Sequence, residues 1–385
     1  MRLAIISISK YPDGDAGAVR NHYIGKIYKL LGYDVSVIGM GDRTLFFPKE
    51  YEGIKYYSLR FSAKGRIGKI FDAILFNKRL LKILKKNKYD TLIFYSGFFM
   101  TATILKRYAI KNKIRLIYDC VEWYSESEFK MGRFSFFYIQ NQLINKKIID
   151  KKYNVICISG FLQKYFSNKG IHTCVIPAIM EVKPLLFENN LSYEKKVNFI
   201  YAGQVGKKDL LKEPIIALKN LYKQGYTNFL FSLYGVEKSE LFRLFNDDEQ
   251  KIIDSFVLCF GKKSRKDVIS SVCKSDFSIL FRNPEELFAK AGFPTKLSES
   301  MANGTPVICN YFGDIGKYAI DDYNAIVSKS LDAVEIEKAF RKAINLDRKI
   351  INSMKKNAYD SAKIFFDYSL YLKTIELFDY ECYDK

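Results

Sequence analysis

The chain has 385 residues, of which 48% are hydrophobic and 27% are charged. This length favours two domains, and the composition is that of a globular protein with enough apolar material for two cores, which argues against wholesale disorder. The longest uncharged stretch, residues 91–105, is 15 residues long. A membrane-spanning helix needs ~20 apolar residues, so we expect no transmembrane segment.

The positive charge of the chain is concentrated in its first half. The formal net charge is +20, and residues 1–175 hold 31 Lys and Arg against 13 Asp and Glu, whereas the remaining residues hold 31 against 29. Such a balance favours an anionic membrane or a nucleic acid as partner. Biased codon usage is an alternative source of lysine, but it acts along the whole chain and does not explain the asymmetry.

None of the seven cysteines forms a pair with metal-ligand spacing, and five lie in apolar runs typical of buried strands: Cys120, Cys157, Cys174, Cys259 and Cys309. The chain starts directly with a strand-like run and shows no secretory signal pattern. We therefore expect a reducing, cytoplasmic compartment and no structural zinc.

The first part of the chain alternates apolar strands with helical spacing. A strand is predicted at residues 2–8, a helix at 18–31 and a strand at 34–40. Further strands are predicted at 91–95, 115–120, 154–159 and 173–177. This alternation predicts a parallel sheet with helices on both faces.

The same rhythm restarts after a looser stretch at residues 184–196. Strands are predicted at 197–202, 229–234, 256–260, 276–281 and 305–310, and helices at 210–224, 333–344 and 348–372. We therefore predict an α/β protein with two Rossmann-like domains facing a cleft. The predicted boundaries are 1–180, 181–360, and a C-terminal helix and tail at 361–385 that packs back towards the first domain.

The most informative segment lies between Arg282 and Asn310. It contains the run Ala-Gly-Phe-Pro-Thr-Lys-Leu-Ser-Glu at 291–299 and Gly-Thr-Pro-Val at 304–307. This segment resembles the retaining family-4 glycosyltransferases, which have the GT-B fold. In that family a Gly-Phe loop leads into a helix whose glutamate binds the ribose of the nucleotide, and the resemblance assigns this role to Glu299.

Elementary chemistry agrees with this role for Glu299. One carboxylate can accept hydrogen bonds from both vicinal hydroxyls of a ribose. The start of the helix offers free backbone N–H groups and a positive dipole end to a diphosphate. The alternative for Glu299 is a helix acid that only interacts with the dipole. The donor-binding residues expected around this helix start are Gly292, Phe293, Pro294, Thr295 and Lys296.

A second match is the run Tyr-Ala-Gly-Gln-Val-Gly-Lys-Lys-Asp at 201–209, which follows a predicted strand. The resembled family places a basic residue of this loop on the pyrophosphate. We assign this role to Lys208, with Gly203 and Lys207 beside it and Arg282 as the second cation. Where no metal is present, cations and backbone donors must stabilise the leaving diphosphate. Solvated loop charges are the alternative.

Three positions depart from the family pattern. Ala291 replaces the first glutamate of the Glu-x7-Glu pair, Gln204 replaces an arginine, and Val121 replaces a histidine at the end of a strand. The neighbouring Glu122 is our candidate for a catalytic group near the sugar, because ligands gather at the carboxyl ends of parallel strands. A surface carboxylate without a catalytic role is the alternative.

The first loop of the chain contains Gly14 and Gly17, which we expect to let the backbone approach the donor, as in the resembled family. Asp13-Gly14-Asp15 has the letters of a metal-binding DxD motif, but it follows Pro12. We interpret it as a turn and predict no metal site.

Two stretches of the first half bear on the acceptor. Residues 64–88 place apolar side chains at helical spacing among the cations Lys69, Lys78, Arg79, Lys82, Lys85 and Lys86. Such a helix binds anionic bilayers, although a sheet-covering helix has a similar pattern. Residues 129–138 mix aromatics with cations, and either hold a lipid-linked acceptor or belong to the core.

The resemblance implies a metal-independent, retaining enzyme without a cofactor. It would move a sugar from a nucleoside-diphosphate sugar to a lipid-linked or polysaccharide acceptor in cell-surface glycan assembly, such as lipopolysaccharide or capsule synthesis. The candidate catalytic residues are Glu122, Lys208 and Arg282. We expect a cytoplasmic protein, peripheral on the inner face of the membrane.

Two other classes of function are compatible with parts of the sequence. The first is a GT-B epimerase or phosphorylase that acts on sugar nucleotides. The second is a basic, non-catalytic nucleic-acid-binding protein, against which the sequence shows no helix-turn-helix, zinc finger or RNA-binding aromatic motif.

Overall fold

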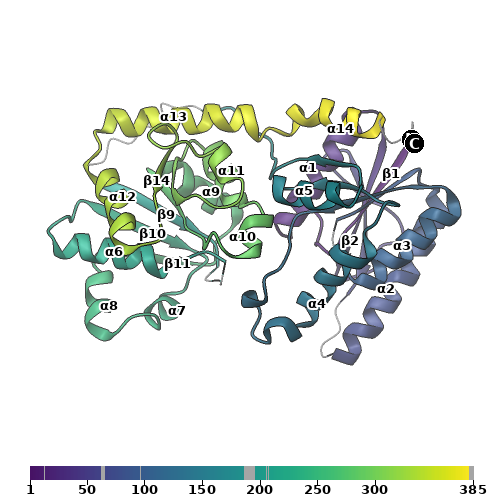
Figure 1. The fold of residues 1–385 in the computed structure, drawn as a ribbon, viewed down its shortest axis with the longest axis horizontal. Coiled ribbons are helices and arrows are strands. Elements are labelled where there is room, and N and C mark those ends of the chain that lie inside the picture. The colour runs from purple at the N-terminus through teal and green to yellow at the C-terminus, as the bar shows by residue number, and fades with distance from the viewer. Residues whose placement is uncertain are drawn as a thin grey trace. The chain divides into compact units, whose positions relative to one another are not determined.

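The computed structural model describes residues 1–12, 14–61, 66–95, 97–185, 196–204, 206 and 208–380. The chain divides into two compact units (Figure 1). The first unit contains Met1–Glu181, Ala291–Phe293 and Asp367–Lys385, and the second contains Val182–Lys290 and Pro294–Phe366. Each unit has its own largely parallel sheet and its own helices. The prediction of an α/β protein with two Rossmann-like domains is confirmed.

The first unit is built on an eight-stranded sheet with the order β3-β4-β2-β1-β5-β6-β7-β8. Only the pairing of β3 with β4 is antiparallel. The strands are β1 Arg2–Ile6, β2 Asp34–Gly41, β3 Lys49–Tyr51, β4 Ile54–Arg60, β5 Thr91–Phe94, β6 Arg115–Cys120, β7 Asn154–Cys157 and β8 Thr173–Val175. The central strands β1 and β5 are buried apolar runs, as expected for a sheet covered on both faces.

The helices of the first unit follow its strands in the βα rhythm that the sequence predicts. They are α1 Ala16–Leu30, α2 Arg66–Asn87, α3 Phe99–Asn112, α4 Phe136–Leu143 and α5 Gly160–Asn168. Helix α1 begins where the side chain of Asp15 accepts the backbone N–H of Ala18 at 2.8 Å, an N-cap that satisfies a donor of the first turn. Asp15 therefore has a local structural role, which agrees with the interpretation of this loop as a turn.

A buried ion pair ties α1 to the sheet of the first unit. Arg20 donates from Nε and Nη2 to the two carboxylate oxygens of Asp119, each at 2.8 Å. The same guanidinium donates to the backbone carbonyls of Ile176 and Pro177. All nitrogens of the Arg20 guanidinium and both oxygens of the Asp119 carboxylate have hydrogen-bond partners, so the ion pair can be buried in the core.

Short helices form the connection between β6 and β7. They are the 3-10 turns η1 Glu126–Glu128 and η2 Gly132–Phe134, helix α4, and the π-helical turn η3 Ile144–Ile148. This connection contains the aromatic and cationic stretch for which the sequence leaves two interpretations open.

The last two helical elements of the described chain belong to the first unit. The 3-10 turn η6 Tyr368–Tyr371 and helix α14 Leu372–Tyr380 follow the point where Tyr368 donates its N–H to the carbonyl of Met180 at 2.9 Å. Asp379 of α14 accepts from Arg115 at 2.6 Å and from the hydroxyl of Tyr33 at 3.0 Å.

The second unit is built on a six-stranded, fully parallel sheet with the order β11-β10-β9-β12-β13-β14. The strands are β9 Val197–Ala202, β10 Phe229–Tyr234, β11 Val257–Gly261, β12 Phe277–Leu280, β13 Val307–Asn310 and β14 Ala325–Ser328. From β9 the following strands β10 and β11 are added towards one edge of the sheet, and from β12 the strands β13 and β14 are added towards the other edge. In open α/β sheets the ligand site lies at such a switch point.

The second unit is covered by helices on both faces. They are α6 Lys212–Lys223, α7 Lys238–Phe242, α8 Asp247–Ile253, α9 Arg265–Lys274, α10 Leu287–Ala291, α11 Thr295–Ala302, the 3-10 turn η5 Ile315–Lys317, α12 Ala333–Asn345 and α13 Arg348–Phe365. Helices α6 and α12 lie side by side (Figure 1). Buried aromatic residues of β9, β10 and β12, including Phe199, Phe231 and Phe277, form the core below them.

The structure differs from the sequence-based expectation at a few elements. The strands β3, β4 and β14 are not predicted. The helix predicted at 348–372 is two helices, because α13 ends at Phe365 and the backbone of residues 366–371 leaves the α-helical path. No helix in the described part of the chain is both long and apolar enough to cross a bilayer.

Candidate active site

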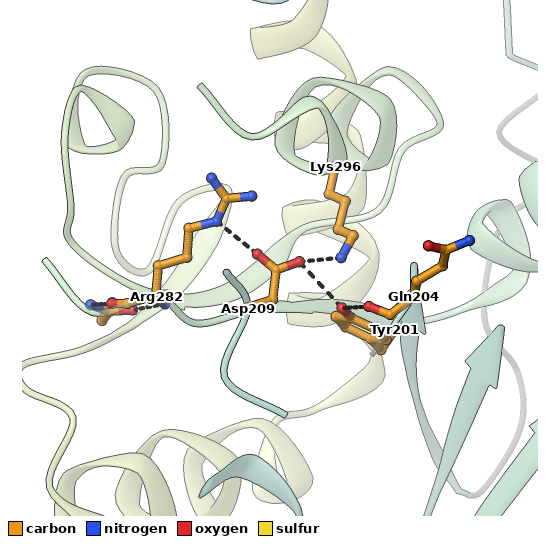
Figure 2. Close-up of polar contacts among 6 residues, drawn as sticks. Tyr201, Gln204, Asp209, Arg282 and Lys296 are labelled. Carbon is orange, nitrogen blue, oxygen red and sulfur yellow. Dashed lines mark hydrogen bonds and ion pairs between the residues drawn. The ribbon is translucent and has the colours of Figure 1, made fainter. Parts of the chain in front are cut away.

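A polar cluster lies where strands β9 and β12 end and helix α11 begins (Figure 2). The two strands are parallel neighbours, so their carboxyl ends lie at the same edge of the sheet. The loop after β9 supplies Asp209, the chain just beyond β12 supplies Arg282, and the first turn of α11 supplies Lys296. Three segments far apart in the sequence therefore meet at one point.

Asp209 is the centre of this cluster. Its Oδ1 accepts a hydrogen bond from Nε of Arg282 at 2.7 Å, and its Oδ2 accepts one from Nζ of Lys296. The hydroxyl of Tyr201 lies 3.3 Å from the same Oδ2 and 3.1 Å from the carbonyl oxygen of Gln204, so these two acceptors share its one proton. The side chain of Asp209 is only 9% exposed, so both cations are held at a buried carboxylate.

The ammonium group of Lys296 lies between the aromatic ring of Tyr201 and Gly203. Its Nζ lies 3.9 Å from the centroid of the Tyr201 ring, a cation-π contact. A Cβ atom placed on Gly203 would lie 2.4 Å from the same Nζ. The glycine at position 203 therefore leaves the space that the lysine occupies. Burial lowers the pKa of Lys296, and the nearby carboxylate of Asp209 opposes this shift.

Arg282 is fixed by its backbone as well as by its side chain. Its N–H donates to Oδ1 of Asn310 at 3.0 Å, and Nδ2 of Asn310 donates back to its carbonyl at 2.9 Å. The guanidinium carbon lies 5.5 Å from the centroid of the Phe312 ring. Of the three guanidinium nitrogens, only Nε has a hydrogen-bond partner within the part of the chain that the structure describes, and Figure 2 shows both Nη groups pointing away from Asp209. These groups are donors that an anionic ligand can use.

The cluster carries more positive than negative charge. Burial raises the pKa of Asp209, but the ion pairs with Lys296 and Arg282 outweigh this effect and lower it to about 2. Asp209 is therefore ionised at neutral pH. With two cations against one carboxylate, the cluster has a surplus of one positive charge in a setting of low dielectric constant, which is the electrostatic requirement of an anion-binding site.

Glu299 lies one turn beyond Lys296 on helix α11. It accepts a hydrogen bond from Nη2 of Arg265 at 3.0 Å, and its side chain is 41% exposed. Protein atoms around the carboxyl group raise its pKa by burial, while Arg265 and Lys296 oppose this shift. The carboxylate is thus held in place by a neighbouring cation and still open to a ligand on one side.

The other predicted donor-binding residues of the second unit have different surroundings. Nζ of Lys208 lies 5.9 Å from the centroid of the Phe288 ring in α10. Pro294 is the N-cap residue of α11, and Thr295 is its first residue. Lys207 lies outside the described residues.

Gly292 and Phe293 directly precede the start of α11 and are grouped with the first unit, and Phe293 is buried. Their proposed role in donor binding stays a prediction.

In the first unit, Gly14 in the first loop and Gly17 in the first turn of α1 both have a packing reason. A Cβ on Gly14 would lie 2.3 Å from the carbonyl oxygen of Lys10, and one on Gly17 would lie 2.4 Å from Oγ of Ser9. Gly14 lets the chain turn back closely on itself before α1, and Gly17 lets the start of α1 pack closely against Ser9. Their approach to a donor stays a prediction, and Asp13 lies outside the described residues.

Glu122 follows strand β6 and is partly buried. Its backbone carbonyl accepts from the side-chain amides of Asn141 and Asn145 at 3.3 and 3.5 Å. Burial raises the pKa of the neighbouring Tyr124, and the carboxylate of Glu122 raises it further. Helix α4 and turn η3 therefore position the segment that carries this candidate.

Asp209, Tyr201 and Arg265 have no assigned role in the sequence-based prediction. Tyr201 and Asp209 are the first and last residues of the second motif, so their positions in the motif could have indicated that they belong to the site. Arg265 has no such signal, because it reaches Glu299 from a helix 34 residues earlier in the chain. Among the described residues, no group of three or more His, Cys, Asp or Glu could hold a metal ion.

Comparison with known proteins gives the class of this site. Residues 182–361, which include the whole cluster, match the family described as Glycosyl transferases group 1. This segment belongs to that family. A search of curated proteins gave no match.

The solved structures that resemble the chain share its fold. Sucrose-phosphate synthase from Thermosynechococcus elongatus matches with a TM-score of 0.77 and 13% identity over 100% of this chain and 99% of that chain. HepE from Anabaena, solved with UDP and glucose, matches with a TM-score of 0.68 and 15% identity over 97% and 98%. WaaG, a glycosyltransferase involved in lipopolysaccharide biosynthesis, matches with 0.68 and 14% over 98% and 99%. The protein is a glycosyltransferase with the GT-B fold.

Proposed function

We propose that the second unit binds a nucleoside-diphosphate sugar through the cluster of Asp209, Arg282 and Lys296. The diphosphate accepts hydrogen bonds from the Nη groups of Arg282 and from Lys296, and Glu299 accepts hydrogen bonds from the ribose hydroxyls. Lys208 and Lys207 extend the positive charge along the same loop. The surplus positive charge at the carboxyl ends of β9 and β12 is the observation that carries this proposal.

The proposed reaction is a retaining sugar transfer without a metal or a cofactor. The bond between the anomeric carbon and the leaving phosphate oxygen breaks, and a bond from the same carbon to the acceptor oxygen forms on the same face. The acceptor hydroxyl gives its proton to the leaving phosphate. Arg282 and Lys296 stabilise the negative charge that grows on the diphosphate in this step. Glu122 is the candidate group on the acceptor side.

The proposed acceptor is a lipid-linked or polysaccharide glycan at the inner surface of the cell membrane, with the first unit binding it. The excess of Lys and Arg in residues 1–175 supports this proposal. Helix α2 supports it too, because Phe71, Ile74 and Leu75 are exposed while Phe76 and Leu80 of the same helix are buried. WaaG, a structural neighbour, takes part in lipopolysaccharide biosynthesis, and we propose a related role in cell-surface glycan assembly.

A thermal-shift and calorimetry screen with UDP, GDP, ADP and their sugar conjugates tests the donor. We expect one class to raise the unfolding temperature, since a ligand at about 100 times its Kd stabilises by about 2.7 kcal/mol. Arg282→Gln and Lys296→Gln should abolish most of this effect. Lys238→Gln, which removes an exposed lysine paired with Asp254 in the same unit, is the matched control. The proposal fails if no nucleotide binds, or if the cluster variants bind as the control does.

A further inference from the structure

Helix α4 carries its polar side chains inwards. Gln140 is buried, and its Oε1 accepts a backbone N–H from the start of α3 at 3.1 Å. Asn141 accepts the N–H of Tyr124 at 3.0 Å, and Gln142 accepts the indole N–H of Trp123 at 3.1 Å. The helix is therefore attached to the first unit by hydrogen bonds of its amide side chains.

The apolar side chains of the same segment are exposed. Phe134, Phe136 and Phe137 are 67%, 53% and 52% exposed, and their neighbours Met131, Ile139 and Leu143 are exposed as well. An ordinary surface helix has the opposite arrangement, with its apolar stripe on the core. Six exposed apolar residues within 13 positions of the chain are typical of an interaction surface. We call these six residues the aromatic face.

Cations flank the aromatic face in the sequence. Residues 129–147 contain four basic residues and no acidic one, and all four are exposed: Lys130, Arg133, Lys146 and Lys147. The nearest acids in the sequence are Glu126 and Glu128 before this stretch and Asp150 after it. Glu128 accepts the N–H of Ser125, and Asp150 pairs with Lys106. The charge around the aromatic face is therefore complementary to an anionic surface.

The inner face of α4 reaches the candidate catalytic segment. Asn141 donates to the backbone carbonyl of Glu122, and the same side chain accepts the N–H of Tyr124. This segment lies at the carboxyl end of β6. One short helix thus holds the segment around Glu122 through Asn141 and also exposes Phe136 and Phe137.

We propose that the aromatic face inserts into the headgroup region of an anionic bilayer and that Lys130, Arg133, Lys146 and Lys147 bind its lipid phosphates. Aromatic side chains bury their rings at this depth while cations remain at the surface. This inference deepens the proposed membrane-side acceptor, because it names the element through which the first unit meets the lipid. Its test is independent of sugar transfer.

Sedimentation with vesicles tests this inference. Vesicles of phosphatidylcholine mixed with phosphatidylglycerol are compared with vesicles of phosphatidylcholine alone. We expect the chain to bind the anionic vesicles, with weakening by about fivefold for each of Lys146→Gln and Lys147→Gln. The combined variant Phe134→Ser, Phe136→Ser, Phe137→Ser should weaken binding on the order of a hundredfold.

The matched control replaces equally exposed apolar residues of the second unit: Val334→Ser, Ile350→Ser and Ile364→Ser. This control should bind vesicles like the unmodified chain. Nucleotide binding by the second unit and the circular-dichroism melting curve report that each variant is folded. Phe71→Ser removes an exposed aromatic side chain of α2, and its vesicle binding shows how much of the membrane affinity comes from α2 and not from α4.

Three results would overturn the inference. The first is undiminished vesicle binding by the combined phenylalanine variant. The second is equal binding of the unmodified chain to neutral and anionic vesicles. The third is a lipid-free dimer, measured by analytical ultracentrifugation, that the phenylalanine variant abolishes, since the aromatic face would then be an interface between copies of the chain.

Discussion

Nε of Arg282 donates a hydrogen bond of 2.7 Å to Oδ1 of Asp209, across 73 residues of sequence. The other carboxylate oxygen of Asp209 accepts from Lys296. An acid at the centre of the proposed diphosphate site has a physical reason, because two partly buried cations without a ligand repel each other and lose hydration. Asp209 stabilises them in the absence of the donor, and the surplus charge remains available for it.

Asp209→Asn should destabilise the ligand-free protein by about 3 kcal/mol, since it leaves two partly buried cations without their counter-ion. A nucleoside diphosphate supplies negative charge at the same place, so this loss should be smaller in its presence. Urea unfolding with and without the nucleotide measures both values. The control Asp248→Asn, in an exposed pair with Lys251, should change stability by less than about 1 kcal/mol. An equal loss with and without nucleotide would contradict this role of Asp209.

Glu299→Ala should weaken nucleotide binding by roughly 1.5–3 kcal/mol, the range for hydrogen bonds to a charged group. Arg265→Ala removes the exposed partner of Glu299 and should cost less than about 1 kcal/mol of binding, because it affects only the position of the carboxylate. Calorimetry with the nucleoside diphosphate measures both changes. Unchanged affinity for Glu299→Ala would exclude the ribose assignment.

Gly203→Ala should weaken diphosphate binding by about tenfold, or about 1.4 kcal/mol. The added methyl group lies where Nζ of Lys296 is found, so the flexible lysine moves away from Asp209 and Tyr201. Because the lysine can move, stability should change less than affinity. Gly206→Ala in the same loop is the matched control, since the nearest atom to its Cβ lies 3.9 Å away. Similar affinities of the two variants would disprove this account of Gly203.

The acid stability of the second unit should depend on Asp209. Its pKa is about 2 in the folded protein, below its ordinary value of 3.8. A lowered carboxyl pKa stabilises the fold above the ordinary pKa, and this contribution, about 2 kcal/mol, is lost as the pH falls from about 4 to about 2. Burial of the Lys296 ammonium reduces the stability that its ion pair with Asp209 contributes. This reduction does not change between about pH 4 and about pH 2, because a lysine side chain stays protonated in acid.

Denaturant unfolding at a series of acidic pH values checks this prediction. The unmodified chain should show the loss, and Asp209→Asn should lack that part of it. The same pH dependence in both proteins would show that other carboxyl groups dominate acid unfolding.

Several elements could be predicted from the sequence because their signals are local. Strands β9 and β10 have the predicted bounds, since each is a run of apolar residues that ends at a polar or glycine-rich loop. The Gly-Phe and Gly-Thr-Pro-Val motifs indicated the glycosyltransferase class, because they are short runs of neighbouring residues that resemble the family pattern. Strand β4 was missed, because its alternating exposure includes the charged residues Lys55 and Arg60, so it lacks a continuous apolar run.

By itself, the sequence determined the βα rhythm, the two-unit organisation and the basic first half, because hydrophobic spacing and charge are properties of neighbouring residues. Only the tertiary structure decided which charges meet. It brought Asp209, Arg282 and Lys296 together from three segments, and it turned the amides of α4 inwards and the phenylalanines outwards. Periodicity shows that a helix has two faces, but the packing of distant segments decides which face is buried.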